Sequence, residues 1–207
     1  MPDVTLASPP SSLSRFLLPL GVFYYLPPLL LATGVVPFSW RFKMLAIMTF
    51  IMIAYDRRQG FTLKDLGIRK DTLKGSLLLH LLVSLLLVIF MFLSFKAGII
   101  RAPTVPGRKM FFVYYLFISC PSQEFLFRSN LFALMDRYHI RGAALQIVLS
   151  AITYSFLHIF YLDVITLIAT LIIGIVWGGI YYLYPNFWGV TLSHAILGIT
   201  SILVGLI

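Results

Sequence analysis

Long apolar stretches separated by short polar segments occupy most of this chain of 207 residues. An α-helix needs about 20 predominantly apolar residues to cross the hydrocarbon core of a bilayer. By that measure the pattern predicts about seven membrane-spanning helices: Phe16–Val36, Met44–Tyr55, Leu77–Phe95, Met110–Met135, Ala143–Tyr161, Val164–Tyr184 and Trp188–Ile207. We therefore expect an all-α fold, a polytopic transmembrane helical bundle.

Two features interrupt the alternation of apolar and polar segments. Pro27 and Pro28 lie inside the first apolar segment, where proline kinks or breaks a helix. The first two segments are therefore expected to form one broken unit. The polar stretch Asp56–Lys74 predicts an interfacial loop or a short amphipathic helix. We expect N-terminal membrane segments with a leader over residues 1–59, and the core of the protein over residues 60–207.

Composition favours membrane insertion over a soluble fold. Hydrophobic residues make up 60% of the chain and charged residues 11%, whereas a soluble domain usually carries about 25% charged residues. The formal net charge is +9, but the basic residues form short clusters between apolar segments, as in membrane loops. These clusters are Arg41 and Lys43, Arg57 and Arg58, Lys64, Arg69 and Lys70, Lys74, and Arg108 and Lys109. We therefore expect the lipid bilayer as a partner and no nucleic acid.

The distribution of Lys and Arg also predicts how the chain crosses the membrane. If the spans alternate in direction, one side collects Arg15, the Arg57–Lys74 cluster, Arg137 and Arg141. That side is the richer in basic residues, which predicts a cytoplasmic N-terminus. No basic segment precedes the first apolar run, so no cleavable signal peptide is expected. We expect a multi-pass integral protein of a bacterial or archaeal cytoplasmic membrane.

Five ionisable residues fall inside the predicted spans: His80, Glu124, Arg128, His158 and His194. An ionisable residue at the centre of a spanning helix costs about 2.5–3.5 kcal/mol on insertion scales, so such residues face the bundle interior and mark function. Glu124 and Arg128 are four residues apart and share one helical face. His80 has no obvious partner in the sequence, and we expect it to be a packing residue.

The other polar residues predict hydrolytic chemistry more strongly than structural roles. A carboxylate and an imidazole together can deprotonate water, and a second imidazole can donate to a developing oxyanion. Glu124, His158 and His194 are therefore the candidate catalytic residues. A neutralising Glu–Arg pair and hydrogen-bonded packing histidines are the structural alternatives. A zinc site is a further alternative, but the chain has no His-Glu-x-x-His spacing on one helix.

Three short motifs carry a resemblance to a known family. They are Gln123-Glu124-Phe125-Leu126-Phe127-Arg128, Tyr154-Ser155-Phe156-Leu157-His158 and His194-Ala195-Ile196-Leu197-Gly198. In order and placement they resemble the Glu-Glu-x-x-x-Arg, Phe-x-x-x-His and His-x-x-x-Asn motifs of the CAAX-processing and bacteriocin-processing (CPBP) intramembrane proteases. This family of glutamic-type membrane endopeptidases includes the Ras-converting CAAX endopeptidase. The resemblance covers the chain from roughly Gly60 to its end.

The resemblance implies a metal-independent endopeptidase without cofactors that cleaves a membrane-associated peptide or a protein C-terminal tail. Glu124 with His158 is expected to activate water, and His194 to stabilise the oxyanion. Arg128, Gln123 and Tyr154 are expected to support them. The chain departs from the family motifs at two positions. Gln123 replaces the first Glu of the first motif, and Gly198 replaces the Asn of the third motif.

Two other functions remain open from the sequence. Cys120 lies one turn before Glu124, and a thiolate beside Arg128 could act as a nucleophile, as in exosortase-like transpeptidases. Alternatively, because an amide cannot act as a base, Gln123 is compatible with a degenerate protease fold that only binds peptides as an immunity or scaffold protein. A Cys120→Ser variant distinguishes the thiol mechanism from the glutamic one.

Overall fold

The computed structural model describes residues 12–99 and 109–205, and all regular secondary structure in these ranges is helical. The α-helices are α1 (Ser12–Pro19), α2 (Leu26–Ala32), α3 (Arg41–Gln59), α4 (Leu73–Lys96), α5 (Lys109–Tyr114), α6 (Cys120–Glu124), α7 (Leu131–Arg137), α8 (Ala143–Leu157), α9 (Val164–Leu183) and α10 (Phe187–Val204). Short π-helical segments are Leu20–Tyr25, Tyr115–Ser119 and Phe125–Asn130, and short 3₁₀ segments are Phe38–Trp40 and His158–Tyr161. The prediction of an all-α bundle is confirmed.

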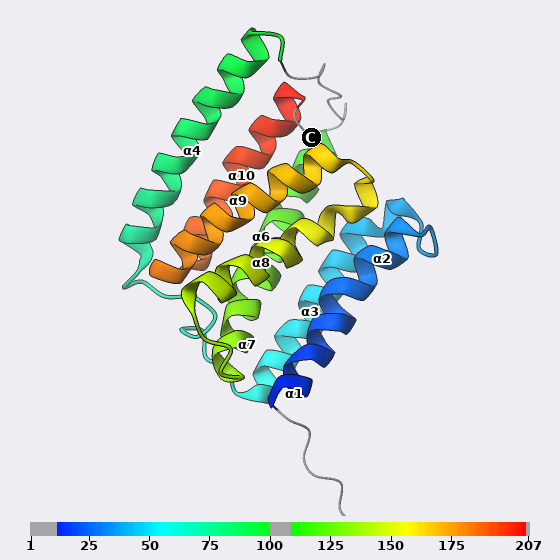
Figure 1. Ribbon diagram of the computed structural model, residues 1–207, viewed down its shortest axis with the longest axis vertical. Coiled ribbons are helices and arrows are strands. Elements are labelled where there is room, and N and C mark those ends of the chain that lie inside the picture. The colour runs from blue at the N-terminus through cyan, green and yellow to red at the C-terminus, as the bar shows by residue number, and fades with distance from the viewer. Residues whose placement is uncertain (1–11, 100–108, 206–207) are drawn as a thin grey trace, which may run out of the picture.

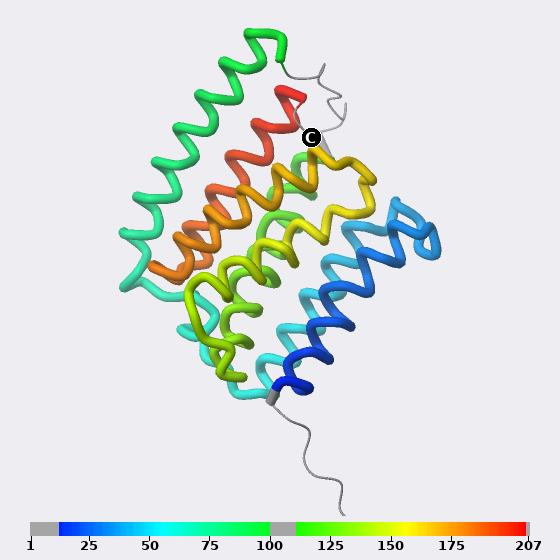
Figure 2. The backbone as a smooth tube through the Cα atoms, in the orientation of Figure 1, coloured from blue at the N-terminus to red at the C-terminus, as the bar shows by residue number. Residues whose placement is uncertain are grey.

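The bundle places α5–α7 between two groups of helices (Figures 1 and 2). Helices α4 and α10 pack along each other on one side, and α1, α2 and α3 lie on the other. Helices α8 and α9 form a closely packed antiparallel pair across the front of the view. The segment with most of the predicted polar site residues is therefore central.

Six helical segments are long and apolar enough to cross a membrane: Leu13–Ala32, Phe38–Gln59, Leu73–Lys96, Ala143–Tyr161, Val164–Leu183 and Phe187–Val204. Their outward faces are apolar, as α4 shows with Leu78, Leu85 and Phe90, each more than half exposed. Such a surface is unfavourable in water and favourable in lipid. The protein is thus a multi-pass integral membrane protein. The predicted span Met110–Met135 is not among the six, although it forms a helical run.

This central run, Lys109–Arg137, is an α-helix interrupted by two π-helical segments. Pro121 lies at the start of α6 and has no N–H to donate to the preceding turn, which accounts for the irregular turn before it. The second π-helical segment, Phe125–Asn130, contains Arg128. Side chains from Ser122 to Met135 are all buried. Single π-helical turns inside α-helices are frequent at functional sites.

The first two apolar segments do not form one broken unit, so that expectation was wrong. Helix α2 begins at Leu26 with proline in its first turn, directly after a π-helical segment whose irregular turn accommodates the missing N–H groups. The π-helical segment Leu20–Tyr25 precedes it, so the helix continues past Pro27 and Pro28. The chain reverses only after Ala32, before α3 starts a separate span.

The polar stretch between α3 and α4 forms hydrogen-bonded turns without an amphipathic helix. The backbone N–H of Thr62 donates to Asp65 Oδ2 at 2.8 Å, which lowers the pKa of the Asp65 carboxyl. Asn186, at the start of α10, donates from Nδ2 to the Arg69 carbonyl at 2.7 Å. This loop therefore fixes the end of α10 that leads to His194.

Candidate functional site

A buried carboxylate–imidazole pair joins α6 to α10. His194 Nδ1 lies 2.5 Å from Glu124 Oε1, and both side chains are almost fully buried. Arg128 Nε lies 3.6 Å from the second carboxylate oxygen, Oε2. The predicted shared face of Glu124 and Arg128 is therefore present, although a π-helical turn connects them.

The Tyr154 ring on α8 is the common neighbour of the other polar side chains. The guanidinium carbon of Arg128 lies 4.4 Å from the centre of that ring. The rings of His158 and His194 have their centres 5.1 Å and 5.9 Å from it. Since none of the Arg128 nitrogens has a hydrogen-bond partner in the described part of the chain, Glu124 and aromatic faces balance its charge. The sequence-predicted residues Glu124, Arg128, Tyr154, His158 and His194 thus converge.

Trp177 on α9 is a supporting residue that the sequence reasoning missed. Its ring stacks on His194 with centres 4.9 Å apart and an angle of 23° between the planes. Its indole Nε1–H donates to Ser193 Oγ at 2.9 Å, and Ser193 Oγ lies 2.8 Å from Ser84 Oγ on α4. These contacts orient the imidazole of His194. A tryptophan in an apolar span is usual, so its type alone gave no signal.

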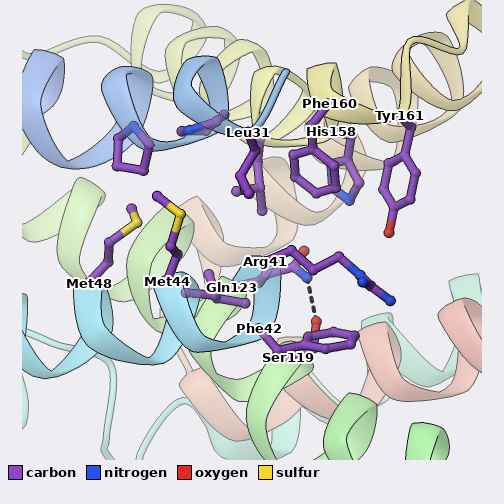
Figure 3. Close-up of a pocket in the computed structure, with 14 residues that line it drawn as sticks. Leu31, Arg41, Phe42, Met44, Met48, Ser119, Gln123, His158, Phe160 and Tyr161 are labelled. Carbon is purple, nitrogen blue, oxygen red and sulfur yellow. Dashed lines mark hydrogen bonds between the residues drawn. The ribbon is translucent and has the colours of Figure 1, made fainter. Parts of the chain in front are cut away.

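A pocket opens beside this cluster and exposes a different pair of predicted residues (Figure 3). It is lined by Pro27, Pro28, Leu31, Arg41, Phe42, Met44, Leu45, Met48, Ser119, Gln123, Leu157, His158, Phe160 and Tyr161. Its free volume of about 40 Å³ is enough for a few water molecules. Glu124 and His194 do not line it. Eight of the fourteen lining residues precede Gly60, so the N-terminal part of the chain forms much of the pocket wall.

The hydrogen bonds of Gln123 and His158 define what each can offer to a molecule in the pocket. Gln123 Nε2 donates to Ser119 Oγ at 2.8 Å, which leaves Gln123 Oε1 without a partner in the described part of the chain. His158 Nδ1 lies 3.0 Å from the Tyr154 carbonyl, which can only accept, so Nδ1 carries a proton. In the neutral ring, Nε2 then has a lone pair that can accept a hydrogen bond or a proton.

The structure also defines the contacts of Cys120 and His80. Cys120 is fully buried, packs against Tyr115 and Ile202, and does not line the pocket. His80, expected to pack without a partner, is buried on α4 and has its Nδ1 2.9 Å from the Ser76 carbonyl. It therefore packs as predicted, but with a partner one helical turn earlier.

Gly198, which stands for the Asn of the third family motif, has no room for a side chain. A Cβ added there would overlap the hydroxyl of Tyr115. The Tyr115 ring also makes an edge contact with His194 at 6.1 Å. Tyr115 thus fills the volume that a larger residue at 198 would need.

Gly198→Ala is therefore expected to destabilise the fold by about 1–3 kcal/mol through overpacking. Gly179 on α9 is the matched control, because a Cβ there meets nothing within 4 Å. Gly179→Ala is expected to be neutral or slightly stabilising, since alanine favours a helix over glycine. Unfolding free energies in mixed micelles check both. Equal values for the two variants would contradict the close packing at Tyr115.

Within residues 12–99 and 109–205, no group of three or more His, Cys, Asp or Glu side chains is arranged to hold a metal ion. The chemical groups that the structure does bring together are one carboxylate, one guanidinium, two imidazoles and one amide. This set can move protons and stabilise an anion.

The comparisons with known proteins agree with the sequence resemblance. Residues 106–200 match the family described as Rce1-like, type II CAAX prenyl endopeptidase. The match covers α5 to α9 and most of α10, and so includes all three motifs. No curated protein and no solved structure gives a significant match to the chain.

Proposed function

Because residues 106–200 form a domain of the Rce1-like type II CAAX prenyl endopeptidase family, we propose that this protein is an intramembrane endopeptidase. Its substrate is a membrane-associated peptide or protein tail. The observation that carries the proposal is the pocket beside the polar cluster. There His158 presents a proton acceptor next to the buried Glu124–His194 pair, inside a multi-pass bundle.

The proposed water lies in the pocket between Gln123 and His158. One of its protons points to Gln123 Oε1, which has no partner in the described part of the chain. The other points to His158 Nε2, which takes it as the oxygen attacks the peptide carbonyl carbon. His158 then gives this proton to the amide nitrogen as the C–N bond breaks, which releases the amine fragment and a new carboxylate. The amide of Gln123 only orients the water, because it cannot act as a base. In this mechanism a histidine takes over the role of the family's first Glu.

We expect the Glu124–His194 pair, which lies behind the pocket wall, to help stabilise the negative charge that develops on the carbonyl oxygen. Glu124 holds His194 through Nδ1 at 2.5 Å, which directs the opposite ring nitrogen, Nε2, away from the carboxylate. Donation from His194 Nε2 to the oxyanion stays a prediction, because His194, like Glu124, lies outside the pocket lining. Arg128 keeps the carboxylate in place from its other side. The expectation that Glu124 itself acts on the water with His158 stays a prediction, since Glu124 lies outside the pocket lining.

The test is cleavage of a defined probe by the purified protein in lipid nanodiscs. A quenched-fluorescent peptide ending in S-farnesyl-Cys-Val-Ile-Met is a suitable probe, because CAAX tails of this kind are what the family description names. We expect cleavage, and an unchanged rate for Cys120→Ser, because Cys120 is buried away from the pocket. Loss of activity in Cys120→Ser, with the fold intact, would contradict a water-based mechanism.

A peptide-binding protein without activity is the second candidate. It is favoured by Gln123 in the pocket and by the volume at Gly198 that Tyr115 occupies. In that case the probe binds but remains intact after prolonged incubation with the wild-type protein. Gln123→Glu tests this candidate, because it places at the pocket the carboxylate that the first family motif has. If the missing carboxylate alone prevents cleavage, the Gln123→Glu variant should cleave the probe.

A further inference from the structure

A cation from outside the family domain lines the same pocket. Arg41 is the first residue of α3 and lies in the pocket wall opposite His158 and Tyr161 (Figure 3). Its guanidinium carbon lies 4.2 Å from the ring centre of Phe38 and 4.6 Å from that of Phe42. These two rings hold the guanidinium flat and shield it from lipid.

The charge of Arg41 is not balanced within the structure. Nη1 donates to the Phe38 carbonyl at 3.2 Å, while Nε is buried without a hydrogen-bond partner. Across residues 12–99 and 109–205, Arg41 takes part in no ion pair. Arg41 lies near the end of the span Phe38–Gln59, and its uncompensated charge is available to an anion that enters the pocket.

The surrounding helix end makes the site more attractive to an anion. Arg41 and Lys43 both lie in the first turn of α3, where the helix dipole already contributes positive potential. That turn contains no acidic residue, and its N-cap residue, Trp40, makes no side-chain capping bond. Two cations in one turn raise the local positive potential, which favours an anion nearby.

A second group in the pocket also lacks its partner. Gln123 is only 7% exposed, lines the pocket, and has an unpartnered Oε1 in the described part of the chain. The pocket therefore combines an unpartnered acceptor on α6, a proton acceptor at His158 and, on α3, a guanidinium that contacts Phe38 and Tyr161 and has its Nε without a hydrogen-bond partner in the described part of the chain. A peptide that ends in, or carries, a carboxylate matches this set of groups.

We propose that Arg41 is a substrate-binding residue that selects a carboxylate on the bound peptide, either the C-terminal carboxylate or an acidic side chain. This inference rests on the proposed function for its substrate class, and its binding test does not require turnover. The carboxylate binds the guanidinium, and the peptide chain extends toward Gln123 and His158 once the helices around the pocket move apart, because its free volume of about 40 Å³ holds only a few water molecules. Arg41 on α3 thus supplies substrate selection to a pocket whose chemistry comes from α6 and His158.

The experiment uses three forms of the farnesylated probe: a free C-terminal acid, a C-terminal amide, and an amide whose last residue is Glu. Binding is measured by fluorescence anisotropy and cleavage by initial rate, both in nanodiscs. The wild-type protein is expected to bind the acid form about tenfold more tightly than the amide. Arg41→Gln should abolish that difference by raising KM for the acid form about tenfold with little change in kcat. The Glu-containing amide shows which kind of carboxylate is selected.

Lys43→Gln is the matched control, because it removes the same charge from the same helical turn but lies outside the pocket lining. It should leave the preference for the acid form unchanged, and Arg41→Lys should retain part of it. Equal binding of all three forms by the wild-type protein would overturn the inference, as would equal effects of Arg41→Gln and Lys43→Gln. A preference for carboxylate forms that depends on Arg41, without any cleavage, would support the inference while contradicting the proposed function.

Discussion

His158→Ala is expected to lower kcat for probe cleavage by roughly 100- to 10,000-fold, the range usual for loss of a general base. The reason is geometric: His158 lines the pocket, and its bond to the Tyr154 carbonyl leaves Nε2 free to accept a proton. KM should change little, because His158 acts on water rather than on the substrate. Steady-state kinetics with the farnesylated probe measure both constants.

The control is His139→Ala, which removes an exposed imidazole between α7 and α8. It should cleave at the wild-type rate. A His158→Ala variant that folds normally and retains more than about one tenth of the wild-type kcat would be too active for a general-base role. In that case the assignment of water activation to His158 is wrong.

Glu124→Gln is expected to destabilise the protein by about 3–5 kcal/mol, as breaking a buried ion pair usually does. The substitution keeps the volume of the side chain but leaves Arg128 fully buried without its carboxylate. It also replaces the carboxylate acceptor of the His194 hydrogen bond with a neutral amide oxygen, which accepts more weakly. The unfolding free energy in mixed micelles should fall accordingly, and cleavage should be lost.

The double variant Glu124→Gln/Arg128→Met separates stability from activity. Methionine replaces the buried cation with an apolar side chain that can pack against Tyr154 and Trp177, which Arg128 now contacts. We expect the double variant to recover most of the lost stability and to remain inactive. If the two single substitutions simply add, the Glu124–Arg128 pair is not coupled, and its structural role has been misjudged.

The sequence predicted the parts of the fold that depend on local pattern. Span length and hydropathy located the helices, because the bilayer requires about 20 apolar residues for each crossing. The four-residue spacing of Glu124 and Arg128 predicted one shared face, and their side chains do lie together. The cost of burying ionisable groups in lipid likewise predicted that the polar residues would face inward, as they do.

The details that depend on how helices rotate against each other were not readable from the sequence. Hydropathy does not show which histidine hydrogen-bonds to Glu124. The packing of α10 against α6 brings His194 to that carboxylate. The pocket wall from α2 and α3 was missed because those residues are far from the motifs in sequence. The division at residues 59 and 60 stays a prediction, although the pocket takes residues from both sides of it.

Isotope labelling of the cleavage product tests the central claim most directly. The farnesylated probe is incubated with the wild-type protein in ¹⁸O-labelled water, and the fragments and the protein are examined by mass spectrometry. Water activated at His158 predicts one ¹⁸O atom in the new carboxylate and no acyl group on the protein, for wild type and Cys120→Ser alike. An intact probe, or an acyl group trapped on Cys120, would contradict the claim that this pocket hydrolyses peptides with an activated water molecule.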